Sequence, residues 1–232
     1  MYAMTNSAGT AARAPMAMRL QPVPAAPAAA VDPLDRLGAP MKAEKNRTIY
    51  FEGDEAAHCY KVTGGTVRLC KVTEDGRRQI AAFLTAGDLF GWTDQDFYNF
   101  SAEAVTDVTL QKFSRARVEE SAKANPALGR RVLTLLSTQL ASAHDHLLLL
   151  GRMTAAERIA SFLLDLVRRQ RHGGSIELAM NRKDVADYLG LTVETVSRTM
   201  SALKRKGIIF FAEPENVQLK QSTALERLAM AA

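Results

Sequence analysis

Three polar side chains near the C-terminal end of the sequence are spaced to share one face of a helix. Glu194, Ser197 and Arg198 lie at positions i, i+3 and i+4. An arginine can donate two hydrogen bonds to guanine O6 and N7, and a carboxylate can accept one from cytosine N4. A serine hydroxyl can bond a base or a phosphate. The trio therefore predicts base reading; the alternative is an ordinary Glu–Arg surface pair worth about 0.3–0.5 kcal/mol.

The residues around this trio predict a helix-turn-helix. Asn181 is expected to cap a first helix that ends at Gly190, and Thr192 to cap a second helix that ends before Gly207. The second helix has apolar residues at spacings of four and three, at Val196, Met200 and Leu203. Such a stripe is buried, so the opposite face with the polar trio is free to enter a DNA groove.

Other side chains of the two helices are candidates for supporting contacts with DNA. Phosphate contacts are expected from Arg182, Lys183, Thr192 and Lys204, and contacts with a thymine methyl group from Val193 and Thr195. The charge distribution favours the same region. Eleven basic and six acidic residues lie between positions 152 and 211, which accounts for the whole net charge of +5. Clustered positive charge of this kind is typical of phosphate binding, although it can also be a solvated basic face.

The run RKDVADYLGLTVETVSR, residues 182–198, resembles the helix-turn-helix signature of the CRP/FNR transcription regulators. Its segment ETVSR has the E-x-x-S-R form of the FNR and FixK branch. The cyclic-AMP receptor branch has an arginine before the glutamate and a glycine at the position of Ser197. The resemblance extends over roughly residues 40–228. It implies an α+β fold with an N-terminal cupin-like antiparallel β-barrel, a long dimerisation helix and a C-terminal winged helix-turn-helix.

The residues support these parts independently of the resemblance. Short β-type runs separated by glycine-containing turns occupy about residues 41–113, and such regular spacing predicts a small antiparallel barrel or sandwich. The expected strands are TIYF, CYKV, TVRLCKV, QIAAFL and EAVTDVTLQKF. Towards the C-terminus, IIFF and VQLK are expected to form a wing hairpin around residues 214–216.

A long helix is expected to begin at Asn125-Pro126, an N-cap followed by proline at the first helical position, and to run to about Leu150. Its apolar residues repeat at alternating spacings of three and four, at Leu133, Leu136, Leu140, Ala143, Leu147 and Leu150. This narrow stripe predicts a parallel homodimer, because a helix buried inside a monomer usually has a broader apolar face.

We therefore expect four parts in the chain. They are a flexible Ala/Pro-rich arm (1–32), a barrel resembling cyclic-nucleotide-binding domains (33–124), a dimerisation helix (125–151) and a winged helix-turn-helix domain (152–232). Gly151 is expected to be a hinge. Thr154 and Glu157 form a capping box, which predicts the start of the next helix.

The barrel lacks residues that a cyclic nucleotide would need. Relatives that bind one carry a glutamate and an Arg-Ser pair; here Trp92 stands about where the glutamate should be, and Phe100 precedes Ser101. A buried phosphate without a guanidinium partner is unfavourable by several kcal/mol. We therefore expect no cyclic nucleotide. The alternative is a regulator gated by haem or another apolar effector, with Trp92, Phe90, Phe97 and Phe100 around the ligand, although aromatic groups in a barrel more often fill the core.

No metal or cofactor is expected. An iron–sulfur cluster needs four thiolates, and the chain has only Cys59 and Cys70, which are interpreted as inert core thiols. The chain thus resembles the FixK type without a cluster. His58 lacks further ligands, and His144 and His146 point in different directions on a helix. An enzyme built on a cupin barrel would need a cluster of His and carboxylate ligands, so we expect no enzymatic activity.

The resemblance implies a homodimeric transcription activator that binds TTGA-type palindromes and controls microaerobic, anaerobic or nitrogen-fixation genes. Its partners would be double-stranded DNA and RNA polymerase. A charged hairpin tip, Glu74, Asp75, Arg77 and Arg78, is a candidate polymerase contact, and a plain solvated turn is the alternative. No apolar run reaches the roughly 18 residues of a membrane span. We therefore expect a cytoplasmic protein with no membrane partner.

Overall fold

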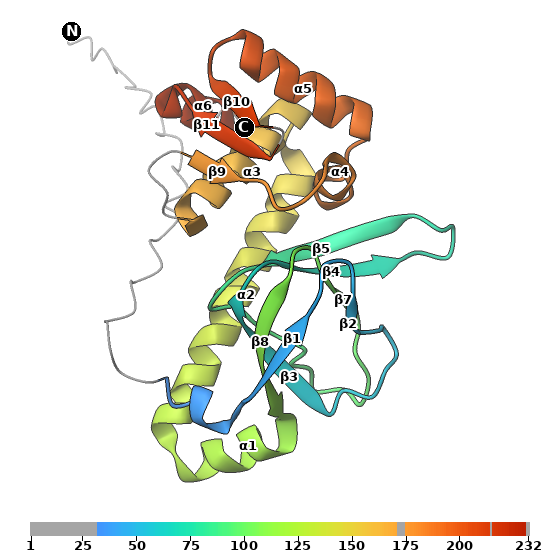
Figure 1. The fold of residues 1–232 in the computed structure, drawn as a ribbon, viewed down its shortest axis with the longest axis vertical. Coiled ribbons are helices and arrows are strands. Elements are labelled where there is room, and N and C mark those ends of the chain that lie inside the picture. The colour runs from blue at the N-terminus through green and yellow to red at the C-terminus, as the bar shows by residue number, and fades with distance from the viewer. Residues whose placement is uncertain (1–31, 171–174, 214, 231–232) are drawn as a thin grey trace, which may run out of the picture. The chain divides into compact units, whose positions relative to one another are not determined.

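The computed structural model describes residues 32–170, 175–213 and 215–230. Most of the predicted N-terminal arm therefore lies outside the described residues, as do the glycine pair 173–174 and the tip residue of the wing. The described chain contains a β-rich domain, then a long helix, α2, and then a C-terminal domain rich in helices (Figure 1). Within these ranges, no helix combines the length and apolar character needed to cross a membrane.

The β-rich domain consists of two antiparallel four-stranded sheets. The first contains, in order, β1 (Ala39–Ala43), β8 (Val108–Ser114), β3 (His58–Gly64) and β6 (Leu89–Phe90). The second contains β2 (Thr48–Tyr50), β7 (Ser101–Ala104), β4 (Val67–Val72) and β5 (Arg78–Leu84). A short 3-10 turn, η1 (Asp35–Leu37), precedes them. The predicted antiparallel jelly roll is confirmed.

Two features of the sheets differ from the prediction. The run EAVTDVTLQKF forms two strands rather than one, because the chain turns at Thr106 and passes from β7 in one sheet to β8 in the other. Strand β1 (APMKA) was not predicted, since it has no β-branched or aromatic residue. It pairs with β8 through the backbone, from Ala39 opposite Lys112 to Ala43 opposite Val108. Because this pairing uses backbone groups, the amino-acid types of the segment do not indicate a strand.

Aromatic side chains fill the space between the sheets. The Tyr50 and Tyr98 rings stack with their centroids 3.7 Å apart, and those of Tyr60 and Phe90 stack at 5.3 Å. All four residues are buried in one apolar cluster. Tight aromatic packing of this kind fills the core of the barrel with side chains.

The four aromatic residues expected around an apolar effector do not come together. Phe90 belongs to the barrel core, whereas Trp92 packs on a different cluster beside α1 and α2. Phe97 and Phe100 are 57% and 38% exposed. The alternative of a common effector pocket formed by these four aromatic residues is therefore wrong. Only Phe90 lies in a strand, whereas Trp92, Phe97 and Phe100 lie in the irregular segment between β6 and β7, so closeness in sequence did not become closeness in space.

Two helices follow the barrel, α1 (Arg115–Ala124) and α2 (Pro126–Arg152). The Asn125 side chain accepts hydrogen bonds from the N–H groups of Ala127 and Leu128, which confirms the predicted start of α2. The predicted hinge at Gly151 is wrong, because α2 continues through this residue and the backbone becomes extended only at Met153. One glycine in a helix costs only about 1 kcal/mol relative to alanine and need not break it.

The predicted dimer stripe lies on the part of α2 that faces away from the barrel core. Leu128 and Val132 are buried against the barrel. In contrast, Leu133, Leu140 and Leu147 are 65%, 58% and 65% exposed. The remaining stripe residues are half-buried or exposed: Leu136, Ala143 and Leu150. A row of exposed leucines is a surface that a second apolar helix could cover.

The C-terminal domain packs helices on a small sheet. Its elements are α3 (Ala155–Gln170), β9 (Ser175–Glu177), α4 (Arg182–Leu189), α5 (Val193–Arg205), β10 (Ile209–Glu213), β11 (Asn216–Leu219) and α6 (Ser222–Ala229). The three strands are antiparallel in the order β10-β11-β9, so β10 and β11 form the predicted wing. The capping box also forms: the Thr154 N–H donates to the Glu157 carboxylate at 2.7 Å. One apolar cluster contains the core of this domain together with Ile80 and Phe83 of β5.

Candidate nucleic-acid interface

Helices α4 and α5 form the expected helix-turn-helix. The Asn181 side chain caps α4 by accepting from the Asp184 N–H at 2.9 Å, and Thr192 caps α5 by accepting from the Thr195 N–H at 3.2 Å. Between them, Gly190 takes the left-handed conformation with φ of 62°, which a glycine adopts without steric cost. The local sequence therefore fixes both helix ends and the sharp turn that joins them.

Helix α5 lies at the edge of the C-terminal domain (Figure 1), and it has one buried and one exposed face. Val196, Met200 and Leu203 are at most 3% exposed. The residues expected to read bases lie on the other side, and all three are exposed: Glu194, Ser197 and Arg198. Lys204 is exposed on the same helix. Neither Arg198 nor Lys204 forms an ion pair or a hydrogen bond through its side chain in the described part of the chain. Their charges therefore remain available to a phosphate or a base.

The Glu194 carboxylate is held in its ionised form. Hydrogen bonds from its own backbone N–H and from the Thr192 hydroxyl lower its pKa, and the positive charge of Arg198 adds to this effect. An ionised carboxylate is only an acceptor of hydrogen bonds. In a DNA groove it would therefore select a base edge that offers a donor, such as cytosine N4.

The residues expected to support DNA binding differ in their exposure. Lys183, Thr192 and Val193 are exposed, and Thr195 is half-buried. Arg182 is the exception among the cations: its guanidinium lies 5.0 Å from the centre of the Phe211 ring in the wing. One of its terminal nitrogens is buried without a hydrogen-bond partner, and burial lowers its pKa. Among the four expected phosphate contacts, Arg182 is thus held most closely by the protein.

The first helix of the motif carries charges that the barrel neutralises. Asp184 in α4 is almost fully buried and accepts from Arg68 of β4 at 3.0 Å and from Arg78 of β5 at 2.5 Å. Arg78 also pairs with Asp187 at 2.8 Å, and Arg68 with Glu103 at 2.7 Å. These ion pairs fasten α4 to the β4–β5 hairpin.

This arrangement changes the expected polymerase surface. Arg78 lies in β5 and points to α4, so it does not belong to the exposed hairpin tip. Glu74, Asp75 and Arg77 remain there as exposed side chains. Asp75 accepts hydrogen bonds from the Thr73 hydroxyl and from Arg77, and these lower the pKa of its carboxyl group to about 2. The tip is therefore a compact charged turn.

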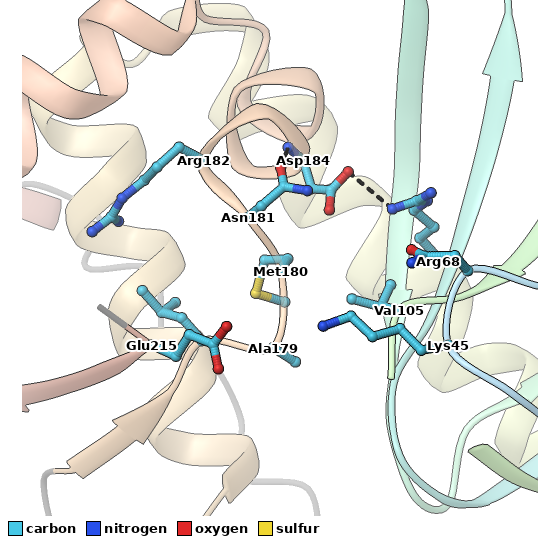
Figure 2. A pocket seen from close by; sticks show the side chains of 11 residues that line it. Lys45, Arg68, Val105, Ala179, Met180, Asn181, Arg182, Asp184 and Glu215 are labelled. Carbon is cyan, nitrogen blue, oxygen red and sulfur yellow. Dashed lines mark hydrogen bonds and ion pairs between the residues drawn. The ribbon is translucent and has the colours of Figure 1, made fainter. Parts of the chain in front are cut away.

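A pocket of about 270 Å³ lies where the barrel meets the start of α4 (Figure 2). Lys45 and Arg68 approach from the barrel, and Asn181 and Glu215 from the C-terminal domain. The Arg68–Asp184 ion pair closes one side of the pocket, while the Arg182 side chain extends away from Arg68. The pocket is lined by charges of both signs and marks the joint between the two domains.

Comparisons with known proteins agree with this geometry. Residues 157–228 match the Crp-like helix-turn-helix domain, and residues 40–125 match the cyclic nucleotide-binding domain. The nitrogen fixation regulation protein FixK of Azorhizobium caulinodans is 44% identical over 197 residues, which cover 83% of this chain and 79% of that protein. The FixK of Rhizobium meliloti is 41% identical over 182 residues, covering 78% of this chain and 83% of that protein.

The chain belongs to the FixK type of the CRP/FNR family. Among solved structures, FixK2 from Bradyrhizobium japonicum superposes with a TM-score of 0.80 at 39% identity, covering 84% of this chain and 98% of that chain. The match includes both domains. Membership in this family makes the chain a DNA-binding transcription regulator, as its helix-turn-helix predicts.

In this FixK-type regulator, the residues at the positions where relatives bind a cyclic nucleotide have other contacts. The Ser101 hydroxyl accepts from the Glu52 N–H at 2.9 Å, and Phe100 beside it is partly exposed. Arg68, the nearest guanidinium on β4 across from β7, is engaged by Glu103 and by Asp184. No guanidinium among these contacts is free for a phosphate group.

Both cysteines are buried in the barrel, at Cys59 in β3 and Cys70 in β4. Burial raises the pKa of the Cys59 thiol to about 12 and that of the Cys70 thiol to about 11. Thiols with such values are protonated and react slowly at neutral pH. His144 is exposed on α2, whereas His146 is half-buried and stacks on Tyr188 of α4 with ring centroids 4.1 Å apart. In the described ranges, no three His, Cys, Asp or Glu side chains gather into a possible metal site.

Sequence reasoning did not find the arginines that join the two domains. Arg68 and Arg78 lie more than one hundred positions from Asp184 in the sequence. Each is a charged residue in a strand, and strand residues of this kind usually face solvent. Only the fold brings them to α4, so the local pattern contained no signal for this contact.

Proposed function

We propose that the chain is a homodimeric activator that binds TTGA-type palindromes through α5. The observation that carries the proposal is the outer face of α5, where Glu194, Ser197 and Arg198 are exposed and Arg198 has no ion pair in the described residues. Arg198 would donate to a guanine and Glu194 would accept from a cytosine, while Ser197 would bond a neighbouring base or phosphate. Lys183, Thr192 and Lys204 would hold the flanking phosphates, and Val193 and Thr195 would contact thymine methyl groups.

The proposed dimer forms along α2. Its exposed leucines would meet the same residues of a second copy in a parallel coiled coil, with Leu133, Leu140 and Leu147 at the centre. The symmetry axis of the dimer would coincide with that of the palindrome. Two α5 helices would then enter successive major grooves about 34–36 Å apart.

The relatives suggest the genes that this regulator controls. Two bear the name nitrogen fixation regulation protein, and a relative from Rhodopseudomonas palustris, 34% identical, is named a transcriptional activatory protein. We infer that the chain activates microaerobic, anaerobic or nitrogen-fixation genes in the cytoplasm and is not an enzyme. The aromatic barrel core and the two protonated thiols support regulation without a cyclic nucleotide or an iron–sulfur cluster.

An activator must also contact RNA polymerase. The exposed tip of the β4–β5 hairpin, with Glu74, Asp75 and Arg77, is the proposed surface. A variant with all three residues changed to alanine should bind DNA with unchanged affinity and activate transcription less in a purified system. Full activation by this variant would exclude the tip as the contact.

The experiment that tests the DNA-binding proposal uses the purified chain without added effector. Its binding to a TTGA-type palindrome is compared with binding to a scrambled duplex of equal length at one fixed salt concentration, because affinity depends steeply on salt. We expect specific binding about 10³-fold tighter than binding to the scrambled duplex, at the lower end of the range for specific regulators. Equal affinity for the two duplexes would refute the proposal.

A further inference from the structure

One arginine connects three segments at the joint between α2 and the helix-turn-helix. The Arg158 guanidinium donates to the backbone carbonyls of Leu150 at 2.9 Å, Met153 at 2.9 Å and Leu189 at 2.8 Å. Leu150 lies in the last turn of α2, Met153 in the link to α3, and Leu189 is the last residue of α4. A single side chain of α3 thus binds the end of the dimer helix and the end of the first motif helix.

The chemistry of the three acceptors suits a guanidinium. Leu150 and Leu189 lie in the last turns of their helices, where carbonyl groups have no donor within the helix and the helix dipole favours a positive charge; Met153 lies in the extended link between helices. Arginine presents its donors in a rigid planar fork, so three bonds in different directions fix the positions of the acceptors relative to one another. A lysine ammonium at the end of a flexible chain cannot impose the same geometry.

The turn of the motif packs directly on this network. A Cβ atom at Gly190 would lie 3.4 Å from an Arg158 terminal nitrogen and 3.5 Å from a methyl group of Leu150. The His146 ring of α2 also stacks on Tyr188 of α4. Stacked rings can slide over one another, whereas the hydrogen bonds of Arg158 are directional. Arg158 therefore supplies directional contacts that orient the motif on α2, beside the ion pairs that join α4 to the β4–β5 hairpin.

We propose that Arg158 is a positioning residue that sets the spacing between the two half-sites that the dimer accepts. The inference rests on the proposed function, in which α2 forms the dimer axis and α5 reads the DNA. Because Arg158 fixes the helix-turn-helix relative to α2, it fixes the separation and the angle between the two α5 helices. Arg158 itself touches no DNA in this account; it acts through the placement of α5.

The experiment measures affinity for a series of duplexes at fixed salt. The series contains the palindrome with its normal spacer, the same half-sites with one or two base pairs added or removed, and a duplex with a single half-site. Two base pairs rotate one half-site by roughly 70° about the DNA axis. The proteins are the wild type, Arg158→Lys, Arg158→Ala and the control Arg168→Ala. Arg168 lies on the same helix, and within the described residues its ion pair is with Asp165 on the surface.

The wild type and Arg168→Ala should prefer the normal spacer strongly. Both Arg158 variants should bind the normal palindrome about tenfold more weakly, because a loosened joint lowers the effective concentration of the second α5 at its half-site. The ratio of their affinity for the normal spacer to their affinity for the altered spacers should also fall about tenfold. Their affinity for the single half-site should stay within about twofold of the wild type. A purely structural role would lower the melting temperature without flattening the spacer preference.

Two contrary results have different meanings. If the wild type binds all spacers equally, the proposed palindrome-reading dimer is refuted. If the wild type prefers one spacer and both folded Arg158 variants keep this preference, only the positioning role is refuted. Should Arg158→Ala fail to fold, Arg158→Lys decides the question, because it keeps the charge and part of the packing.

Discussion

The two helices of the helix-turn-helix use their charges in opposite ways. In α4, Asp184 and Asp187 are bound by two arginines of the barrel at 2.5 to 3.0 Å, and Asp184 is almost fully buried. In α5, Arg198 and Lys204 are exposed, and neither side chain forms an ion pair or a hydrogen bond in the described residues. The two carboxylates of α4 are satisfied inside the protein, whereas these two cations of α5 remain available to an external partner.

This difference separates charges that stabilise the fold from charges that remain available to bind DNA. An ion pair that is nearly dry is strongly directional, and removing one member leaves a buried charge without compensation. An exposed, hydrated charge contributes little to the stability of the fold. It can, however, bind a DNA phosphate and release the counterions that surround it. Loss of the α4 carboxylates should therefore affect stability, and loss of the exposed α5 cations should affect binding.

The largest effect is expected from Asp184→Asn. The amide keeps the volume of the side chain but removes the negative charge that Arg68 and Arg78 share. Because each arginine retains one other carboxylate, we expect the free energy of unfolding to fall by about 3 kcal/mol, the lower end for a broken buried ion pair. Denaturant unfolding followed by the fluorescence of Trp92 and by circular dichroism measures this loss.

The matched control is Asp165→Asn in α3. Asp165 also pairs with two arginines, Arg168 and Arg169, but its side chain is 39% exposed. Its loss should change the free energy of unfolding by less than about 1 kcal/mol. Similar losses for the two variants would remove the distinction between the supporting and the recognising helix.

The next largest effect is expected from Arg198→Ala, now on binding. Losing a bidentate contact with guanine should weaken the affinity for the palindrome by about 1–3 kcal/mol per half-site and relax the preference at that base pair. The free energy of unfolding should change by less than about 0.5 kcal/mol, because the side chain is exposed. Titration of duplexes with each base at the contacted position measures both affinity and preference. An unchanged order of preference would remove Arg198 from the base-reading residues.

The contrast between α4 and α5 also separates what the sequence could predict from what it could not. The caps at Asn181 and Thr192, the turn at Gly190 and the apolar stripe of α5 depend on residues within one or two helical turns of one another. Local patterns of this type determine local structure. For this reason the motif and the exposure of its reading face were predicted before the fold was known.

The parts that were not predicted depend on contacts between residues far apart in the chain. Asp184 lies in the first turn of α4, and its burial under Arg68 and Arg78 requires the whole barrel. Strand β1 was not predicted because its pairing uses backbone groups. The aromatic residues near Trp92 were grouped only because they are close in the sequence. The expected hinge at Gly151 was wrong, because a glycine weakens a helix without ending it.

The smallest of the three effects is expected from Lys204→Ala, and it tests whether the free charges of α5 all act alike. Lys204 is expected to contact a phosphate, which carries no sequence information. Its loss should weaken binding to the palindrome and to random DNA by the same factor. Because each phosphate contact releases about one counterion, the slope of log affinity against log salt concentration should fall by about one per subunit. Arg198→Ala should change base preference instead, so equal behaviour of the two variants on specific and random DNA would mean that the outer face of α5 binds DNA only through its charge.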